Sequence, residues 1–327
     1  MSDQRKVVFQ GEVGANSHMA CNAVYPEYQA VPCPTFEDCF HALQTGEAEL
    51  GMIPIENSVA GRVADIHSLL PGSNLHIVGE YFMPIRFQLM GIKGTKLEDL
   101  KSVQSHIMGL GQCRKFIRKH GLKPIIGADT AGSARQVVEG GDKTIGAFAP
   151  ELAAEVYGLD ILARNCEDAA HNTTRFVILS PENKQAANSG QPIITTFVFR
   201  VRNVSAALYK GLGGFATNNV NMTKLESYQL EGQFFASMFY ADIEGHPEDP
   251  NVALALEELA FYSTELNILG VYNASPFREK KFGNLRPIVP CVLHQENNSC
   301  RPCSNGKPPM YRSGRLRTGL VTRTLHV

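Results

Sequence analysis

The chain has 327 residues, of which 43% are hydrophobic, and a formal net charge of -1. That length allows two or three modules with separate cores, and the small net charge gives no reason to expect binding to nucleic acid or to an acidic membrane. No stretch reaches the ~20 apolar residues of a membrane span, and the apolar run Val7 to Phe9 is too short for a signal peptide. We therefore expect a cytoplasmic protein whose eight cysteines are reduced thiols.

The chain begins with a strand, a glycine loop and a helix. Residues 6–9 predict a buried strand, which leads through Gly11 and Gly14 to Ser17 and a helix over 18–25. A helix N-terminus offers free backbone N–H groups to a carboxylate. Ser17 would serve an ordinary helix cap equally well, so both interpretations stay open.

Polar residues follow the next predicted strand, residues 49–55, after a helix over 36–43. Glu56, Asn57 and Ser58 come directly after that strand. Open α/β sheets place their ligand crevice at the carboxyl ends of strands, although a turn could use the same residues.

Similar polar clusters precede two later helices. Ser105 and His106 lead into a predicted helix over 109–119 that carries Gln112, and Asp129 and Thr130 precede a helix over 134–139. A lone His at a helix start is more often a capping or packing residue, so we leave His106 out of the candidate set. A strand over 144–148 and a helix over 151–157 continue an alternation that predicts a parallel α/β architecture.

The segment from Asp168 to Leu179 runs from a polar cluster into an apolar strand. It places Thr173, Thr174 and Arg175 at the mouth of that strand. A hydroxyl beside a guanidinium suits a substrate that is protonated on oxygen while its carboxylate is held by a planar charged fork. The alternative is that Asn172 and Thr173 only finish a turn and that Arg175 is a solvated surface charge.

A polar segment over 181–192 predicts a linker, and a different pattern follows it. The second half reads as strand, helix, strand, strand, helix, strand, which is the order of a ferredoxin-like module. The predicted elements are strand 193–201, helix 205–216, strands 220–229 and 234–243 joined by a tight turn at 230–233, a helix from 251, and strand 266–271.

Residues 279–327 differ in kind from the rest of the chain. They hold nine Lys or Arg against two Glu, with dispersed Pro and Ser and no periodicity, which predicts a disordered tail. The tail has no dense basic block with interleaved aromatics, so binding to nucleic acid is disfavoured. Cys300 and Cys303 form a lone CxxC without the second pair that a zinc site needs.

Five motifs together resemble the prephenate dehydratase family. They occur in the expected order: Gln10-Gly11, Glu56-Asn57-Ser58 with Gly61, Ser105-His106 with Gln112-Cys113, Asp129-Thr130-Ala131, and Asn172 to Phe176. The module over 193–278 resembles the ACT-type regulatory domain of that family. The resemblance implies an α/β catalytic domain over 6–180 with a two-lobed, type II periplasmic-binding-protein-like fold. Lobe one would hold 6–84 plus 175–180, and lobe two would hold 85–174.

The resemblance also implies a reaction, the decarboxylating dehydration of prephenate to phenylpyruvate without a metal or other cofactor. Thr174 would be the hydrogen-bond donor to the departing hydroxyl, and it shares the implied catalytic set with Ser105, Asn57 and Gln112. Arg175 would clamp a carboxylate, and Glu56 would brace the cleft. The full implied substrate-binding set is Arg175, Glu56, Ser58, Gly11, Ser17, Thr130 and Phe176.

Feedback inhibition by phenylalanine and assembly into a homodimer or homotetramer are the further implications. The effector residues would be Asn203, Ala206, Ala207, Leu208, Glu226 and Ser227. This sequence has Tyr228-Gln229 where phenylalanine-binding relatives usually carry Arg-Pro, and Ala206 stands in place of a glycine. Two alternatives remain: an enzyme that acts on arogenate, and a non-catalytic amino-acid-binding sensor, because one fold serves several functions.

Overall fold

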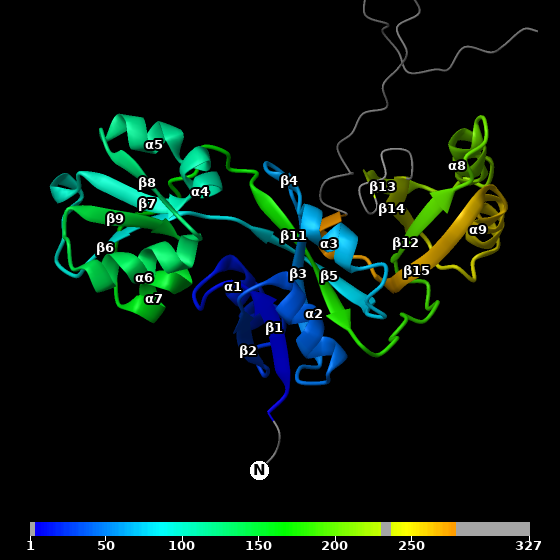
Figure 1. Ribbon diagram of the computed structural model, residues 1–327, viewed down its shortest axis with the longest axis horizontal. Helices are drawn as coiled ribbons and strands as arrows, with labels where there is room; N and C mark the ends of the chain where they lie inside the picture. Colours follow the sequence, from blue (N-terminus) through cyan, green and yellow to red (C-terminus); the bar gives the residue numbers. More distant parts are fainter. Residues whose placement is uncertain (1–3, 230–236, 279–327) are drawn as a thin grey trace, which may run out of the picture. The chain divides into compact units, whose positions relative to one another are not determined.

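A computed structural model describes residues 4–229 and 237–278 (Figure 1). The predicted turn at 230–233 and the tail over 279–327, with its two cysteines, lie outside the described residues. The described part contains three β-sheets, two in the first half of the chain and one in the second. Within that part, no helix is long and apolar enough to cross a membrane, and no group of three or more His, Cys, Asp or Glu could hold a metal ion.

Lobe one is built on a sheet of order β2-β1-β3-β11-β5, with β4 paired to β3. Its elements are β1 (Lys6–Gln10), α1 (Asn16–Val24), β2 (Gln29–Cys33), α2 (Phe36–Gln44), β3 (Leu50–Asn57), β4 (Gly61–Arg62), α3 (Ala64–Leu69), β5 (His76–Pro84) and β11 (Thr173–Ser180). Strands β1, β2 and β3 are parallel, but β11 lies antiparallel between β3 and β5. The expected parallel sheet is therefore wrong for this lobe, because the chain returns from lobe two in the opposite direction.

Lobe two carries a sheet of order β10-β6-β9-β7-β8. Its elements are β6 (Gln88–Gly91), a 3-10 turn (Leu97–Asp99), β7 (Ser102–His106), α4 (Ile107–Gln112), α5 (Arg114–Lys119), β8 (Lys123–Gly127), α6 (Thr130–Gly140), β9 (Ile145–Ala149), α7 (Glu151–Tyr157) and β10 (Asp160–Ala163). This sheet is mixed too, since β6 is antiparallel to β9 and β10.

The predicted helix over 109–119 is two short helices. Cys113, which is fully buried, leaves helical geometry between α4 and α5. The Asp168 carboxylate accepts a hydrogen bond from the Lys115 amide at 3.1 Å, so a residue distant in sequence satisfies the first turn of α5. No local pattern signals such a break.

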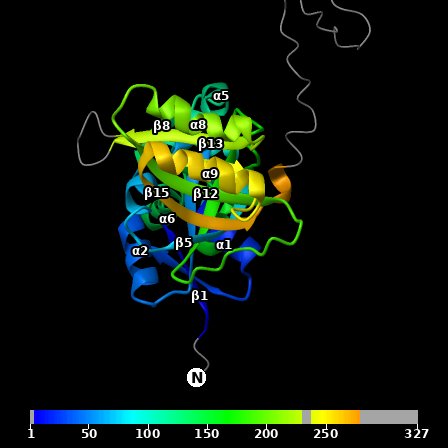
Figure 2. The same ribbon diagram turned by 90° about the vertical axis from the view of Figure 1, so that its right-hand side faces the viewer.

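The third sheet has the order β13-β14-β12-β15, and its pairs are all antiparallel. Its elements are β12 (Ile193–Val201), α8 (Ala207–Thr217), β13 (Met222–Gln229), β14 (Ser237–Glu244), α9 (Pro250–Tyr262) and β15 (Ser263–Asn273). Helices α8 and α9 cover one face of this sheet (Figure 2), where Phe197 and Phe199 join their core. The predicted ferredoxin-like βαββαβ module is confirmed.

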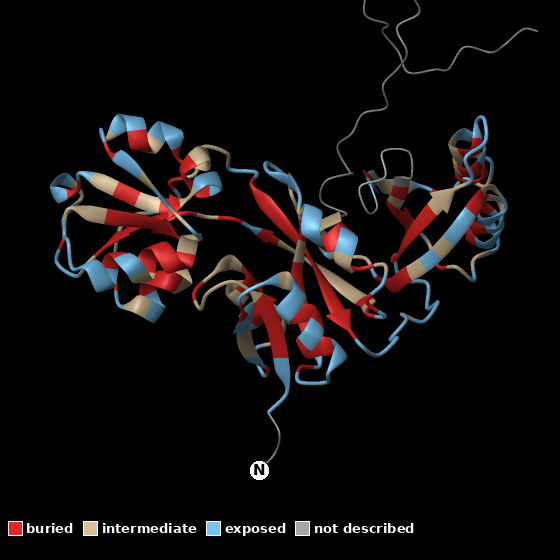
Figure 3. Cartoon of the chain, viewed as in Figure 1, coloured by how far each residue is buried: buried red, intermediate tan, exposed pale blue. Residues whose placement is uncertain are grey.

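The opposite face of the ferredoxin-like module packs against the sheet of lobe one. One buried cluster contains Ile53, Val177 and Leu179 of lobe one together with Val198 and Tyr272 of the module. Figure 3 shows strands β3 and β11 buried along most of their length. Because β11 is covered on both faces, its successive side chains enter two different environments.

Candidate active site

A β-bulge brings Asn57 and Thr174 to the same face of lobe one. Strand β11 pairs Thr174 with Asn57 and Arg175 with Glu56, and then shifts register so that Phe176 faces Pro54. Ile55 is the extra residue. Since Ile55 packs in the core shared with the module, plain alternation would turn Asn57 toward the module as well. The bulge reverses the alternation, as bulges near functional sites often do.

The side chain of Asn57 is held in one orientation. Its Oδ1 accepts hydrogen bonds from the amides of Val59 at 2.9 Å and Ala60 at 2.8 Å. Its Nδ2 must therefore point the other way, and it donates to Thr174 Oγ1 at 2.9 Å and to Asn172 Oδ1 at 2.8 Å. Thr174 thus accepts a hydrogen bond while its own proton stays available, since no acceptor for that proton is found among the described residues.

Asn172 connects this pair to lobe two. Its Nδ2 donates to Gln112 Oε1 at 2.6 Å, and the residue is 1% exposed. Gln112, Asn172, Asn57 and Thr174 therefore form one hydrogen-bonded row across the two lobes. The sequence predicted three of these four residues, whereas Asn172 was part of the motif over 172–176 without a role of its own. Its place directly before a strand that carries Thr174 was the available signal.

Ser58 binds the backbone that carries Thr174. Its hydroxyl donates to the His171 carbonyl at 2.9 Å and accepts from the Thr173 amide at 3.0 Å. A hydroxyl has one proton, and that of Ser58 is used within the chain itself. We place Ser58 in the support of the site rather than in contact with substrate.

Ser105 makes no hydrogen bond to the row in the described part of the chain, which does not fit the catalytic role predicted for it. The residue is fully buried, and its hydroxyl donates to the carbonyl of Phe148 on β9 at 2.7 Å. A Cβ added at Gly109 would lie 2.8 Å from Ser105 Oγ, so α4 packs tightly over this serine. Its proton is used inside lobe two, where it ties β7 to β9.

Arg175, Glu56 and Phe176 also need correction as substrate-binding residues. Arg175 is 2% exposed and faces the module, where its guanidinium binds Glu56 at 3.0 Å and Glu80 at 2.9 Å. Adjacent residues of a strand point to opposite faces, so Arg175 cannot share a substrate face with Thr174. Phe176 points to the same side as Thr174 but is 1% exposed within a hydrophobic core.

The loop over 11–14 lies against lobe two. Val13 accepts a hydrogen bond from the Tyr157 hydroxyl at 2.9 Å, and Gly14, at φ +90°, is so close that an added Cβ would lie 2.9 Å from Ala153 Cα. Gly11 also has a positive φ of 117°. Only glycine tolerates such a backbone conformation with so little space.

Ser17 and Thr130, two further predicted substrate-binding residues, lie at the starts of helices α1 and α6. Ser17 does not cap α1, which begins at Asn16 after Ala15 without any side-chain cap. Since no side chain in the described part of the chain caps this helix, the other interpretation, a carboxylate at the first-turn amides of α1, stays a prediction. Thr130 is the first residue of α6, whose cap is Asp129. No hydrogen bond joins Thr130 to the row within the described ranges.

The predicted effector residues fall in two places on the module. Asn203, Ala206, Ala207 and Leu208 lie between β12 and the first turn of α8. Ala206 has a φ of 62°, a conformation that favours glycine. Glu226 and Ser227 lie on β13, where Glu226 binds Lys224 at 2.7 Å and the Ser227 carbonyl accepts from Arg62 at 2.8 Å.

Comparison with known proteins identifies the family. The family model described as prephenate dehydratase matches residues 7–184. A bifunctional N-acyl-homoserine lactone acylase/prephenate dehydratase from Komagataeibacter europaeus is 50% identical over 280 residues, which are 86% of this chain and 100% of that protein. Arogenate dehydratase 2 from Petunia hybrida is 36% identical over 281 residues, covering 82% of this chain and 71% of the relative.

A solved structure supports the same assignment. Prephenate dehydratase from Arthrobacter aurescens, determined in complex with L-Phe, has a TM-score of 0.76 and 30% sequence identity, and the match covers 82% of this chain and 90% of the other. The family model and these relatives together show that the chain belongs to the prephenate dehydratase family of lyases.

Proposed function

We propose that the chain converts prephenate to phenylpyruvate, and that Thr174 donates a hydrogen bond to the hydroxyl that leaves. The bond between the ring and its carboxylate breaks, and its electron pair completes the aromatic ring. The ring hydroxyl takes up one proton, which comes from solvent, and departs as water. Carbon dioxide is the other product. Aromatisation drives the reaction, so the protein has to assist one departing oxygen.

The observation that carries this proposal is the direction of the Asn57 to Thr174 hydrogen bond. Asn57 donates to the threonine oxygen, which leaves the threonine proton for the substrate. A threonine hydroxyl is a weak acid, so Thr174 acts as a positioned donor, and such a donor is typically worth ~10²–10⁴ in rate. Gln112 and Asn172 hold the row in place, and the open first turn of α1 near Ser17 is our proposal for one substrate carboxylate.

The test measures phenylpyruvate by ultraviolet absorbance after adding prephenate to the full-length chain. We expect turnover by the wild type and a loss of about 10²–10⁴-fold in kcat for Thr174→Val, which keeps the shape and removes the hydroxyl. Thr173→Val is the matched control, because the Thr173 hydroxyl donates to the His171 carbonyl. Near-normal turnover by a folded Thr174→Val protein would refute the role of the hydroxyl.

Arogenate is the alternative substrate. It carries an amino group where prephenate has a keto group, and several relatives at about a third identity are named for arogenate. Both substrates lose the same two groups from the same ring, so Thr174 would have the same role. The ratio of kcat/KM for the two compounds decides between them.

Amide hydrolysis of N-acyl-homoserine lactones is a second candidate, because the relative at 50% identity is named for that activity as well. A hydroxyl nucleophile needs a general base within hydrogen-bond reach. In the described part of the chain, no His or carboxylate contacts Thr174 Oγ1, so the row favours the lyase reaction. Acylase activity that survives Thr174→Val would locate that chemistry elsewhere.

We also propose that phenylalanine inhibits the enzyme through the ferredoxin-like module, acting as an ACT domain in a homodimer or homotetramer. The L-Phe complex of the Arthrobacter protein supports this proposal. The test repeats the prephenate assay with millimolar phenylalanine. Turnover that ignores phenylalanine would indicate that the change to Tyr228-Gln229 has removed the contact.

A further inference from the structure

The ferredoxin-like module and the candidate site lie on opposite faces of strands β3 and β11. On β11, Thr174 faces the row and Arg175 faces the module. On β3, Asn57 faces the row and Glu56 faces the module. The two pairs are direct neighbours in register, Thr174 with Asn57 and Arg175 with Glu56.

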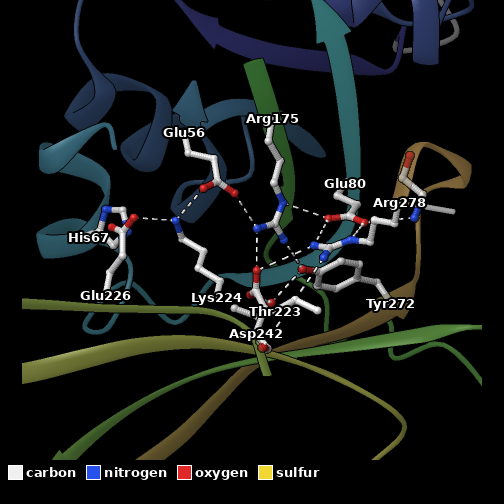
Figure 4. A network of polar contacts seen from close by, with 12 residues as sticks. Glu56, His67, Glu80, Arg175, Thr223, Lys224, Glu226, Asp242, Tyr272 and Arg278 are labelled. Carbon is white, nitrogen blue, oxygen red and sulfur yellow. Dashed lines mark hydrogen bonds and ion pairs between the residues drawn. The ribbon is translucent and has the colours of Figure 1, made fainter. Parts of the chain in front are cut away.

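Arg175 is bound to Asp242 and Tyr272 of the module (Figure 4), and Thr196 closes these contacts into a ring of hydrogen bonds. Its Nη1 donates to Asp242 Oδ2, and its Nη2 donates to the Tyr272 hydroxyl at 2.9 Å. Thr196 donates to Asp242 Oδ1 at 2.6 Å, which uses its only proton. Tyr272 must therefore donate to Thr196 across the 2.7 Å that separates their oxygens. Each hydroxyl in the ring has one direction, and Arg175 is the donor from lobe one.

Burial makes this ring costly to break. Arg175 and Asp242 are 2% and 0% exposed as side chains. Burial alone would lower the pKa of Arg175. The carboxylate of Asp242 outweighs that effect and keeps this pKa well above its ordinary value. Separating such a pair leaves uncompensated charge in a core. Arg175 must therefore follow the module if the module moves.

A second contact ties β3 to the same module. Lys224 of β13 binds Glu56 at 2.6 Å and Glu226 at 2.7 Å. Glu226 belongs to the predicted effector set, and Glu56 precedes Asn57 directly. Two ion pairs through Lys224 thus connect Glu226 to Glu56, the residue next to Asn57.

We propose that Arg175 is a positioning residue through which the ferredoxin-like module holds Thr174 against Asn57. Thr174 is the second residue of β11, and Asn57 is the last residue of β3. Strand ends open more easily than strand centres. Neighbouring Cα atoms lie ~3.8 Å apart, so fixing the side chains of Arg175 and Glu56 also fixes the backbone of Thr174 and Asn57. The turnover readout of this proposal rests on the proposed function.

The test uses two conservative variants in the full-length chain. Tyr272→Phe removes one oxygen and no charge, and Asp242→Asn removes one charge and keeps the shape. Thr195→Val is the matched control, because Thr195 is fully buried on the same strand as Thr196 and donates to the Gly245 carbonyl at 2.7 Å, away from Arg175. We expect both variants to lower kcat about three- to tenfold with little change in KM, and the control to keep wild-type kcat.

Amide hydrogen exchange gives a readout that does not depend on activity. Exchange at residues 57–60 and 173–175 should rise in Tyr272→Phe and stay unchanged in Thr195→Val. Unchanged kcat and unchanged exchange in Tyr272→Phe would overturn the proposal, even if Asp242→Asn fails to fold. If the wild type consumes neither prephenate nor arogenate, the proposed function has failed, and the exchange data alone then decide whether Arg175 positions Thr174.

Discussion

Gly270 offers a steric way to separate the module from lobe one without changing a polar group. It lies on β15 where that strand passes β5 of lobe one. A Cβ added at Gly270 would overlap the Ile77 carbonyl oxygen and lie 2.7 Å from Ile77 Cβ. Non-bonded carbons pack at ~3.5–4.0 Å, so Gly270→Ala has to push the two sheets apart by roughly 1 Å.

That displacement is large compared with a hydrogen bond. The contact between Arg175 and Tyr272 is 2.9 Å long, and roughly 1 Å of added length would take it outside hydrogen-bonding range. Overpacking of this kind typically costs ~1–3 kcal/mol. For a chain of this size we expect Tm to fall by about 2–5 °C, and kcat to fall about three- to tenfold if Arg175 positions Thr174.

The assay combines thermal unfolding with prephenate turnover, and Gly213→Ala is its control. Gly213 lies in α8, where an added Cβ would meet nothing within 4 Å. Alanine at a helical position is favoured over glycine by roughly 0.5–1 kcal/mol, so this variant should keep or raise Tm and keep wild-type kcat. Unchanged Tm and kcat in Gly270→Ala would refute the reasoning, since β15 and β5 would not then be in contact in the working protein.

Three further predictions follow from the same structure. Ala206→Gly should raise Tm by about 1–3 °C in the absence of phenylalanine, because it relieves a φ of 62°; an unchanged or lower Tm would mean that this backbone conformation is not adopted. Burial lowers the pKa of His67, so the unfolded chain binds the proton more readily and stability should fall as the pH drops below ~6.5. In urea unfolding at pH 7.5 and 5.5, His67→Gln should lose less stability on acidification than the wild type. An identical pH dependence would contradict the attribution of this loss to His67. Lys224→Met should cost about 1–3 kcal/mol in urea unfolding, because it leaves Glu56 and Glu226 facing each other without their shared cation; no loss of stability would show that this contact contributes little.

Sequence patterns predicted which residues belong to the site better than they predicted the sheet face on which each side chain lies. Asn57 and Thr174 were both predicted at strand ends, and they lie within hydrogen-bonding distance. The two-residue period of a strand argues against a shared substrate contact of Thr174 and Arg175. The two residues are consecutive, so their side chains cannot face one substrate together. That rule alone could have separated the donor from the guanidinium.

The rest depended on contacts between distant parts of the chain. The face to which Asn57 points is set by the extra residue Ile55, and a one-residue shift in pairing leaves no mark in local hydrophobicity. Ser105 was predicted to lead into a helix, but it lies inside β7 (Ser102–His106), and its partner is a backbone carbonyl 43 positions later. Such partners are fixed by tertiary packing, which single-sequence patterns do not carry.

The buried charges beneath the site are better explained by positioning than by stability. Three cations, Arg175, Lys224 and Arg278, meet four carboxylates where lobe one packs on the module. Buried ion pairs often add little net stability compared with well-packed apolar residues, and the same interface already contains a hydrophobic cluster. The charges add directionality to the contact. A guanidinium forms hydrogen bonds with its partners in only a few geometries, whereas packed apolar surfaces can shift relative to each other. A site that depends on the placement of one threonine hydroxyl gains from such a constraint directly behind it.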